Sequence, residues 1–179
     1  MVMYLVDTNV MLAASAVSNL SNLAVRAMPQ EIELREIIYN WLVDFDQSEQ
    51  RIVLDEEGLV RSEYDRNMPF NQQEQEYGMK VLQYKLDRSL VEYVPIDSLE
   101  SNGEHIALLD AAHEALVTDR EDRKWVACAL AAQILFDQVP PIVYGAETDW
   151  FISETQLRGI GLCFQRLLPD VWYTSRVGT

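Results

Sequence analysis

The stretch MVMYLVDTNVMLAASAV, residues 1–17, decides the fold class. Its first six residues are apolar, the polar triplet Asp7-Thr8-Asn9 follows, and small and apolar residues resume at once. A short apolar run that ends at polar residues is typical of a buried strand. The stretch therefore predicts a central strand that delivers a carboxylate, Asp7, to the start of the next element.

Two further acidic clusters stand where the chain changes from one element to the next. Asp119 and Asp122 open a strongly helical stretch, and Glu147 and Asp149 follow a second short apolar run, PIVYGA at 141–146. In an open α/β sheet such positions converge on one crevice outside the carboxyl ends of the strands. Carboxylates crowded there repel one another unless something positive lies between them, so the pattern favours a divalent-metal site.

Strand and helix patterns alternate along the rest of the chain. Apolar spacing near 3.6 residues and the N-capping Asp55 predict helices, and short apolar runs predict strands. We expect helices over 30–46, 56–67, 71–90 and 122–136, and a helix or helix-like turn over 105–118. Strands are expected over 1–6, 51–55, 91–96 and 141–146, with a short final strand after 159, a helical turn and a loosely held end. This order predicts one domain over 1–179, an α/β fold that forms a three-layer α/β/α sandwich around a mostly parallel sheet.

Two of these helices have predicted buried faces. In the helix over 56–67 the inward face should carry Leu59, Val60 and Glu63. In the helix over 71–90 the candidate buried positions are Tyr77, Val81, Tyr84 and Leu86.

The composition is that of an ordinary globular chain. Of 179 residues, 49% are apolar and 24% charged, which is enough apolar material for a real core. No run approaches the roughly 20 apolar residues of a membrane span, and the N-terminal run is too short and lacks the basic flank of a signal peptide. We therefore expect a cytoplasmic protein with no membrane partner. Cys128 and Cys163 belong to no metal-binding or redox motif and are expected to be buried free thiols.

The net charge of −15 argues against a nucleic-acid partner, because proteins that bind nucleic acids usually present a basic surface. A nuclease of this charge needs a basic partner or a local basic strip. Arg120, Arg123 and Lys124 flank Asp122, and they either pair with acids in solvent or contact phosphates.

Each acid also has a simpler interpretation. Asp7 and Asp149 suit helix N-caps, and Asp122 suits the first turn of a helix, where it complements the helix dipole. Glu63, one of many helical glutamates, would by default be exposed. Three polar residues in a row after Val6 exceed what capping needs, and this excess favours a functional role for Asp7.

Four motifs, taken together and in order, carry a family resemblance. They are YLVDTNVMLAA at 4–14, LVRSEY at 59–64, DREDRKWVACALAA at 119–132 and IVYGAETDWF at 142–151. Through them the chain resembles the PIN-domain family of metal-dependent ribonucleases. The segment 67–118, which holds both His105 and His113, matches no family motif, and we assign these histidines no role.

The resemblance implies a set of site residues. The family's catalytic and metal-binding acids fall on Asp7, Glu63, Asp122 and Asp149, with Asp119 a less favoured occupant of the third position. Glu147 stands where many members have a second aspartate, and it is a candidate metal ligand with a longer arm. Contacts to substrate would come from Thr8, Asn9, Arg120, Arg123 and Lys124.

The resemblance also implies a function. The four acids would hold Mg²⁺ or Mn²⁺, both of which prefer oxygen ligands, for endonuclease cleavage of RNA more than DNA. The protein would be a homodimer, and it could be the toxin of a toxin–antitoxin pair. Two alternatives stay open: an inactive PIN-like scaffold for protein partners, and another carboxylate-metal α/β protein such as a phosphatase or receiver domain. The missing DxDxT motif and the missing lysine after the last strand argue against the second alternative.

Overall fold

Five parallel strands form the main sheet of the computed structural model, which describes residues 2–18, 20–70, 75–101 and 103–178. The strands are β1 (Met3–Val6), β2 (Arg51–Asp55), β3 (Val91–Val94), β6 (Ile142–Tyr144) and β7 (Phe164–Arg166). Their order in the sheet is β3-β2-β1-β6-β7, and each neighbouring pair is parallel. The predicted mostly parallel sheet is confirmed.

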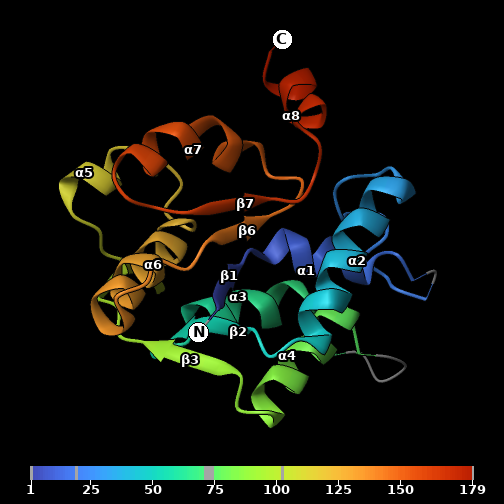
Figure 1. The fold of residues 1–179 in the computed structure, drawn as a ribbon, viewed down its shortest axis with the longest axis horizontal. Helices are drawn as coiled ribbons and strands as arrows, with labels where there is room; N and C mark the ends of the chain where they lie inside the picture. Colours follow the sequence, from blue (N-terminus) through green and yellow to red (C-terminus); the bar gives the residue numbers. More distant parts are fainter. Residues whose placement is uncertain (1, 19, 71–74, 102, 179) are drawn as a thin grey trace.

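Helices cover both faces of this sheet (Figure 1). They are α1 (Thr8–Ser15), α2 (Ile32–Gln47), α3 (Leu59–Asn67), α4 (Tyr77–Asp87), α5 (Ala111–Glu114), α6 (Arg123–Phe136), α7 (Thr148–Gly159) and α8 (Asp170–Val177). The helix α1 packs against α2 and α4, while α6 packs against β1, β2 and β3. The three-layer α/β/α prediction is therefore confirmed. Among the described residues, no helix is both long enough and apolar enough to cross a membrane.

The central strand β1 is apolar because both of its faces are covered. Met3, Leu5 and Val6 have no exposed surface, and Leu5 and Val6 lie beside Ile142 and Val143 of β6. Continuous apolar runs are the pattern of strands in buried parallel sheets. Because β1 and β6 are parallel neighbours, the residues that follow them emerge at the same edge of the sheet.

The helix α3 begins three residues later than predicted. Its first amides, those of Leu59 and Val60, donate to the carboxylate of Asp55 at 2.7 and 2.8 Å. Asp55 therefore caps the helix as expected, but it does so across a turn that ends at Gly58, whose φ of +80° suits glycine. The turn places Val60 and Tyr64 in the core, and Leu59 is only half-buried.

The predicted buried face of α4 is partly wrong. Val81 is buried, but Tyr84 is exposed, and Met79 and Leu82 are buried instead. The cause is a close crossing: a Cβ at Gly78 would lie 2.8 Å from that of Met11, so this glycine faces α1 and sets which side of α4 is inward. Residues 71–74 of the predicted helix lie outside the described residues.

The helix predicted over 105–118 is also wrong for most of its length. The strands β4 (Ser98–Ser101) and β5 (Glu104–Ala107) form an antiparallel hairpin, and within 105–118 only Ala111–Glu114 is an α-helix. The turn uses Gly103 at a φ of +82°. Cross-strand pairing overrides the helical preference of the alanines and leucines that follow.

The C-terminal segment is anchored, contrary to the expected loose end. It forms α8, in which Trp172 and Tyr173 are buried. The Tyr173 hydroxyl donates to the carbonyl oxygen of Gly145 at 2.6 Å. Cys128 is a buried free thiol as predicted, whereas Cys163, also free, is half-buried.

Lys85→Met is expected to reduce the free energy of unfolding by about 3 kcal/mol. The buried Lys85 ammonium donates to the carbonyl oxygens of Phe45, Ser48 and Gln50 at 2.6, 2.9 and 2.9 Å, and so ties the end of α2 to the start of β2. Methionine fills the space but leaves these acceptors unpaired. Urea denaturation measures the loss. The exposed Gln83→Met on the same helix is the control, and equal midpoints for the two variants would contradict the assignment.

Candidate functional site

The candidate site lies where the sheet changes winding direction. The chain runs from β1 to β2 on one side and later places β6 on the other side of β1. In open α/β sheets, ligands bind in the crevice outside the carboxyl ends of the strands at such a switch point. Asp7 directly follows β1, and Glu147 lies just after β6. Asp122 directly precedes α6, and Glu63 lies on α3.

Asp7 is a buried carboxylate held from both sides. One oxygen accepts from the backbone and side-chain amides of Asn9 at 2.9 and 2.7 Å, and the other accepts from the Trp150 indole at 2.6 Å. Burial raises its pKa to about 7 in spite of these bonds, and the negative charges of Glu147 and Glu63 add to the rise. Asp7 therefore caps α1, as the simpler interpretation held, and also faces the other acids.

The two residues that follow Asp7, Thr8 and Asn9, are held within the protein. The Asn9 side-chain oxygen accepts from the Gly145 amide at 2.9 Å, which ties the end of β1 to the turn after β6. The Thr8 hydroxyl is buried and has no hydrogen-bond partner among the described residues. Of these two predicted substrate contacts, Thr8 is thus buried and Asn9 is half-buried.

Asp122 precedes α6 but does not cap it. Its side chain makes no capping hydrogen bond, so the simple helix-end interpretation does not account for it. Burial raises its pKa to about 8, with contributions from the charges of Asp7, Asp119 and Glu147, while Lys124 opposes the rise. The negative charge of Asp7 is therefore close enough to Asp122 to raise its pKa.

Glu147, rather than Asp149, is the acid of the last loop that faces Asp7. Glu147 is half-buried and accepts from the Asp149 amide at 3.3 Å, and its pKa is raised by burial and by the charges of Asp149 and Asp119. The Asp149 side chain is exposed and lies with Asp119 and Asp122 along a separate cavity of about 310 Å³. The charge of Glu147 thus raises the pKa of Asp7, and the charges of Asp7, Asp119 and Glu147 raise that of Asp122, whereas Asp149 is exposed.

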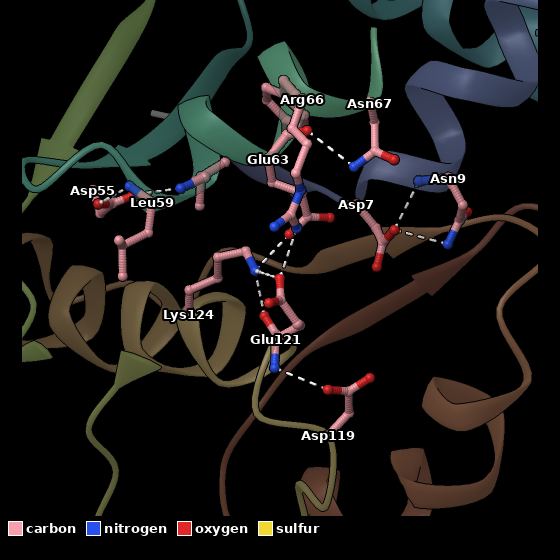
Figure 2. A network of polar contacts seen from close by, with 12 residues as sticks. Asp7, Asn9, Asp55, Leu59, Glu63, Arg66, Asn67, Asp119, Glu121 and Lys124 are labelled. Carbon is pink, nitrogen blue, oxygen red and sulfur yellow. Dashed lines mark hydrogen bonds and ion pairs between the residues drawn. The ribbon is translucent and has the colours of Figure 1, made fainter. Parts of the chain in front are cut away.

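Glu63 is turned inward and paired with a buried lysine (Figure 2). Its carboxylate lies 2.5 Å from the Lys124 ammonium, and the two side chains are only 15% and 7% exposed. The default interpretation of Glu63 as an exposed helical residue is therefore wrong. Lys124 in turn donates to the Glu121 carbonyl oxygen, and Glu121 pairs with Arg66 at 2.8 Å.

The two remaining predicted cationic contacts differ in availability. The Arg123 guanidinium is 14% exposed and pairs with Glu114 of α5 at 2.6 Å, so it braces the loop before α6. Arg120 is exposed and has no ion pair within the described part of the chain. It lines a cavity of about 260 Å³ together with Arg66, His105 and Lys124, next to the Glu63 side of the crevice.

The donor set agrees in kind with a hard divalent cation, because it consists of carboxylates beside an unpaired buried hydroxyl, that of Thr8. Across residues 2–18, 20–70, 75–101 and 103–178, no three His, Cys, Asp or Glu side chains lie close enough together to hold a metal ion as they stand.

Comparisons with protein-family models, with characterised proteins and with solved structures found no match for this chain. The interpretation of the site therefore rests on its geometry and on the four motifs. Sequence reasoning missed two contacts that define the site, the Trp150 indole on Asp7 and Lys124 on Glu63. The polar residues were visible, but nothing local indicated which of them would meet.

Proposed function

We propose that this chain is a Mg²⁺- or Mn²⁺-dependent endonuclease that hydrolyses phosphodiester bonds. The observation that carries the proposal is that buried Asp7 and half-buried Asp122 and Glu147 all have raised pKa values, and that Asp7 and Glu147 follow the strands on either side of the switch point of the sheet. Strongly perturbed carboxylates in a crevice of this kind are typical of functional sites. Burying three such groups without a ligand is costly, and a cation offsets that cost.

In this proposal Asp7, Asp122 and Glu147 would hold the metal. Glu63, which is paired with Lys124, would contribute to the same site. A bound divalent ion supplies an activated water and neutralises charge on the scissile phosphate. The chain's own residues prepare the site: Trp150 and Asn9 fix the Asp7 carboxylate, and Arg123 braces the loop that carries Asp122. Because burial raises the pKa of Asp7 to about 7 and that of Asp122 to about 8, metal binding would release protons from these two acids.

The substrate in this proposal is RNA rather than DNA, which follows from the resemblance of the motifs to PIN-type ribonucleases. Arg120 and Arg66 line one cavity and supply local positive charge for a phosphate, although the chain as a whole has a net charge of −15. A cytoplasmic toxin whose antitoxin, or another basic protein, covers the acidic surface is the biological setting that fits this charge.

The test is incubation of purified protein with labelled RNA and labelled single-stranded DNA in Mn²⁺, Mg²⁺ or EDTA. We expect cleavage of RNA with Mn²⁺ or Mg²⁺ and none with EDTA. Asp122→Asn is the inactive control, and Glu57→Gln, an exposed residue outside the crevice, should cleave like wild type. Equal cleavage by wild type and Asp122→Asn would identify a contaminating nuclease and overturn the proposal.

A non-catalytic scaffold that binds protein partners is the second candidate. The specific observation in its favour is that Lys124 already neutralises Glu63, in a chain of net charge −15. The same assay separates the two functions. A scaffold cleaves neither nucleic acid with any of the metals.

We also propose that the protein is a homodimer. Ile32 and Ile37 on α2 and Tyr84 on α4 are exposed at 60%, 40% and 58%, although other aromatic residues of these helices pack internally. These helices pack against each other, and large apolar side chains left exposed on them support a partner surface there. Light scattering across a concentration series should give twice the chain mass of 20.6 kDa. A monomeric mass at every concentration would refute the dimer.

A further inference from the structure

The strand β5 has an unpaired edge. At the end of its ladder with β4, the Leu108 amide donates to the Asp97 carbonyl oxygen at 2.8 Å, and hydrogen-bonded pairs alternate with non-bonded pairs from there. The backbone groups of His105 and Ala107 therefore point away from β4. Among the described residues these four groups make no hydrogen bond, although Ala107 is buried. Buried backbone groups are nearly always paired, so this edge can accept another chain.

A cavity of about 260 Å³ follows this edge. Residues 104–107 of β5 line it together with Arg66 of α3 and Arg120 of the loop before α6. Successive side chains of a strand point to opposite faces, so an unbroken run of lining residues indicates that the cavity lies along the edge of the strand. The same strand packs against α6. The unpaired backbone groups of β5 therefore border a hollow between the hairpin and two helices.

One cation of this cavity is not already paired. Lys124 and Arg66 form ion pairs with carboxylates that line the same cavity (Figure 2). Arg120 is exposed and has no ion pair within the described part of the chain. Glu104, also exposed, adds one negative charge to the lining. A ligand with a single carboxylate suits this balance, whereas Glu104 would repel a strongly acidic ligand.

We propose that this cavity binds the extended C-terminal segment of a protein partner, which adds a strand to β5 and places its terminal carboxylate on Arg120. Free backbone groups on a strand edge recognise another extended backbone, and a guanidinium binds a carboxylate through two hydrogen bonds. The outward groups of His105 and Ala107 lie about 7 Å apart along the strand, so about three residues of the partner cover them.

A nucleotide suits the same cavity less well. No Phe, Tyr or Trp is among the described residues that line it, so a base has no ring to stack on except that of His105. A peptide needs no such ring, because its backbone supplies the recognition. The inference goes beyond the proposed function and does not require cleavage. In the proposed nuclease, the bound terminus would compete with a substrate phosphate for Arg120.

Peptide selection with the full chain tests the role of the carboxylate. The probe is a library of short fluorescent peptides with random sequences and free C-termini, from which the wild-type protein selects its tightest binders. Fluorescence anisotropy then compares each binder with its C-terminally amidated form. We expect amidation to weaken binding about tenfold or more, because it removes a charged hydrogen bond. Arg120→Gln should abolish the difference between the two forms.

Proline substitutions test the strand edge. His105→Pro removes an outward amide of β5 without breaking a hydrogen bond to β4, and its ring blocks another backbone, so binding should weaken about tenfold or more. Glu100→Pro is the matched control. It removes the outward amide directly opposite, on the far edge of the same hairpin, and should bind like wild type. Peptides N-methylated at alternate residues keep the edge testable if His105→Pro fails to fold, since only one of the two alternations should lose binding.

Each of four results would overturn the proposal. Equal affinity for the acid and amide forms would remove the carboxylate from Arg120. Equal effects of the two proline variants would remove the edge of β5. The absence of any selected peptide would remove the site itself. A short RNA that binds wild type, and loses affinity in Arg120→Gln but not in His105→Pro, would assign the cavity to phosphate instead.

Discussion

Asp7→Asn is expected to abolish metal-dependent RNA cleavage while leaving the protein folded. Asp7 is the most buried acid of the crevice, and its two oxygens are aligned by Asn9 and Trp150. An asparagine supplies one neutral oxygen where the metal needs a carboxylate, so we expect a loss of more than about a hundredfold in activity. The measurement is the RNA cleavage rate with Mn²⁺. A fully active variant would remove Asp7 from the site.

The stability of this variant should depend on pH in a defined direction. Because the folded-state pKa of Asp7 is about 7 rather than 3.8, the folded protein keeps a proton that the unfolded chain has lost between these values. This group alone therefore lowers wild-type stability by about 1.4 kcal/mol per pH unit as the pH rises through that window. The variant lacks this loss. However, the side-chain NH₂ of the new asparagine faces the N–H group of Trp150 or Asn9. Two donors that face each other reduce the free energy of unfolding by about 1–3 kcal/mol.

The two effects predict a crossover. Metal-free Asp7→Asn should melt below wild type near pH 4 and at or above wild type near pH 8, where Asp7 would be charged in both states. Thermal melting in EDTA across this range checks the sign. Asp149→Asn, an exposed change nearby, is the control and should track wild type at each pH. A variant that is unfolded at every pH would contradict the expectation.

Glu63→Gln should cost at least about tenfold in activity and raise the Mn²⁺ concentration required. The structure supplies the reason: glutamine leaves the buried Lys124 ammonium without its 2.5 Å partner, next to Asp122. The unpaired cation then competes with the metal for Asp122. The cleavage rate as a function of Mn²⁺ concentration measures both effects.

The controls for Glu63 lie in the turn before its helix. Glu56 and Glu57 are exposed, and their glutamine variants should keep wild-type rates within the small range typical of surface changes. If Glu63→Gln behaves like them, its pairing with Lys124 has no part in the function. Addition of Lys124→Met to Glu63→Gln should restore the metal affinity, because the pair is then removed as a unit.

The local sequence pattern was enough to predict several strands and helices, and also the edge of the sheet at which the site lies. The apolar runs of β1, β2 and β6 are readable because a buried parallel strand is apolar on both faces, and Asp7 and Glu147 follow two of these runs directly. The hairpin at 98–107 and the late start of α3 escaped this reasoning. Cross-strand pairing and the Asp55 cap, rather than local periodicity, decide them.

The sequence by itself determined that Asp7, at the end of β1, and the acids after β6, Glu147 and Asp149, follow neighbouring parallel strands, since chain order and strand polarity are enough to place strand ends. Only the tertiary structure decided which side chains meet there. Trp150 donates to Asp7 from 143 positions away, and Lys124 pairs with Glu63 of another helix. Such contacts depend on the rotation and depth of packed helices, which arise from the shape of the whole core, such as the crossing of α1 and α4 at Gly78. For this reason Glu63, predicted on the inward face of its helix as a metal ligand, is half-buried and paired with a lysine, and Asp149, also predicted as a ligand, is exposed.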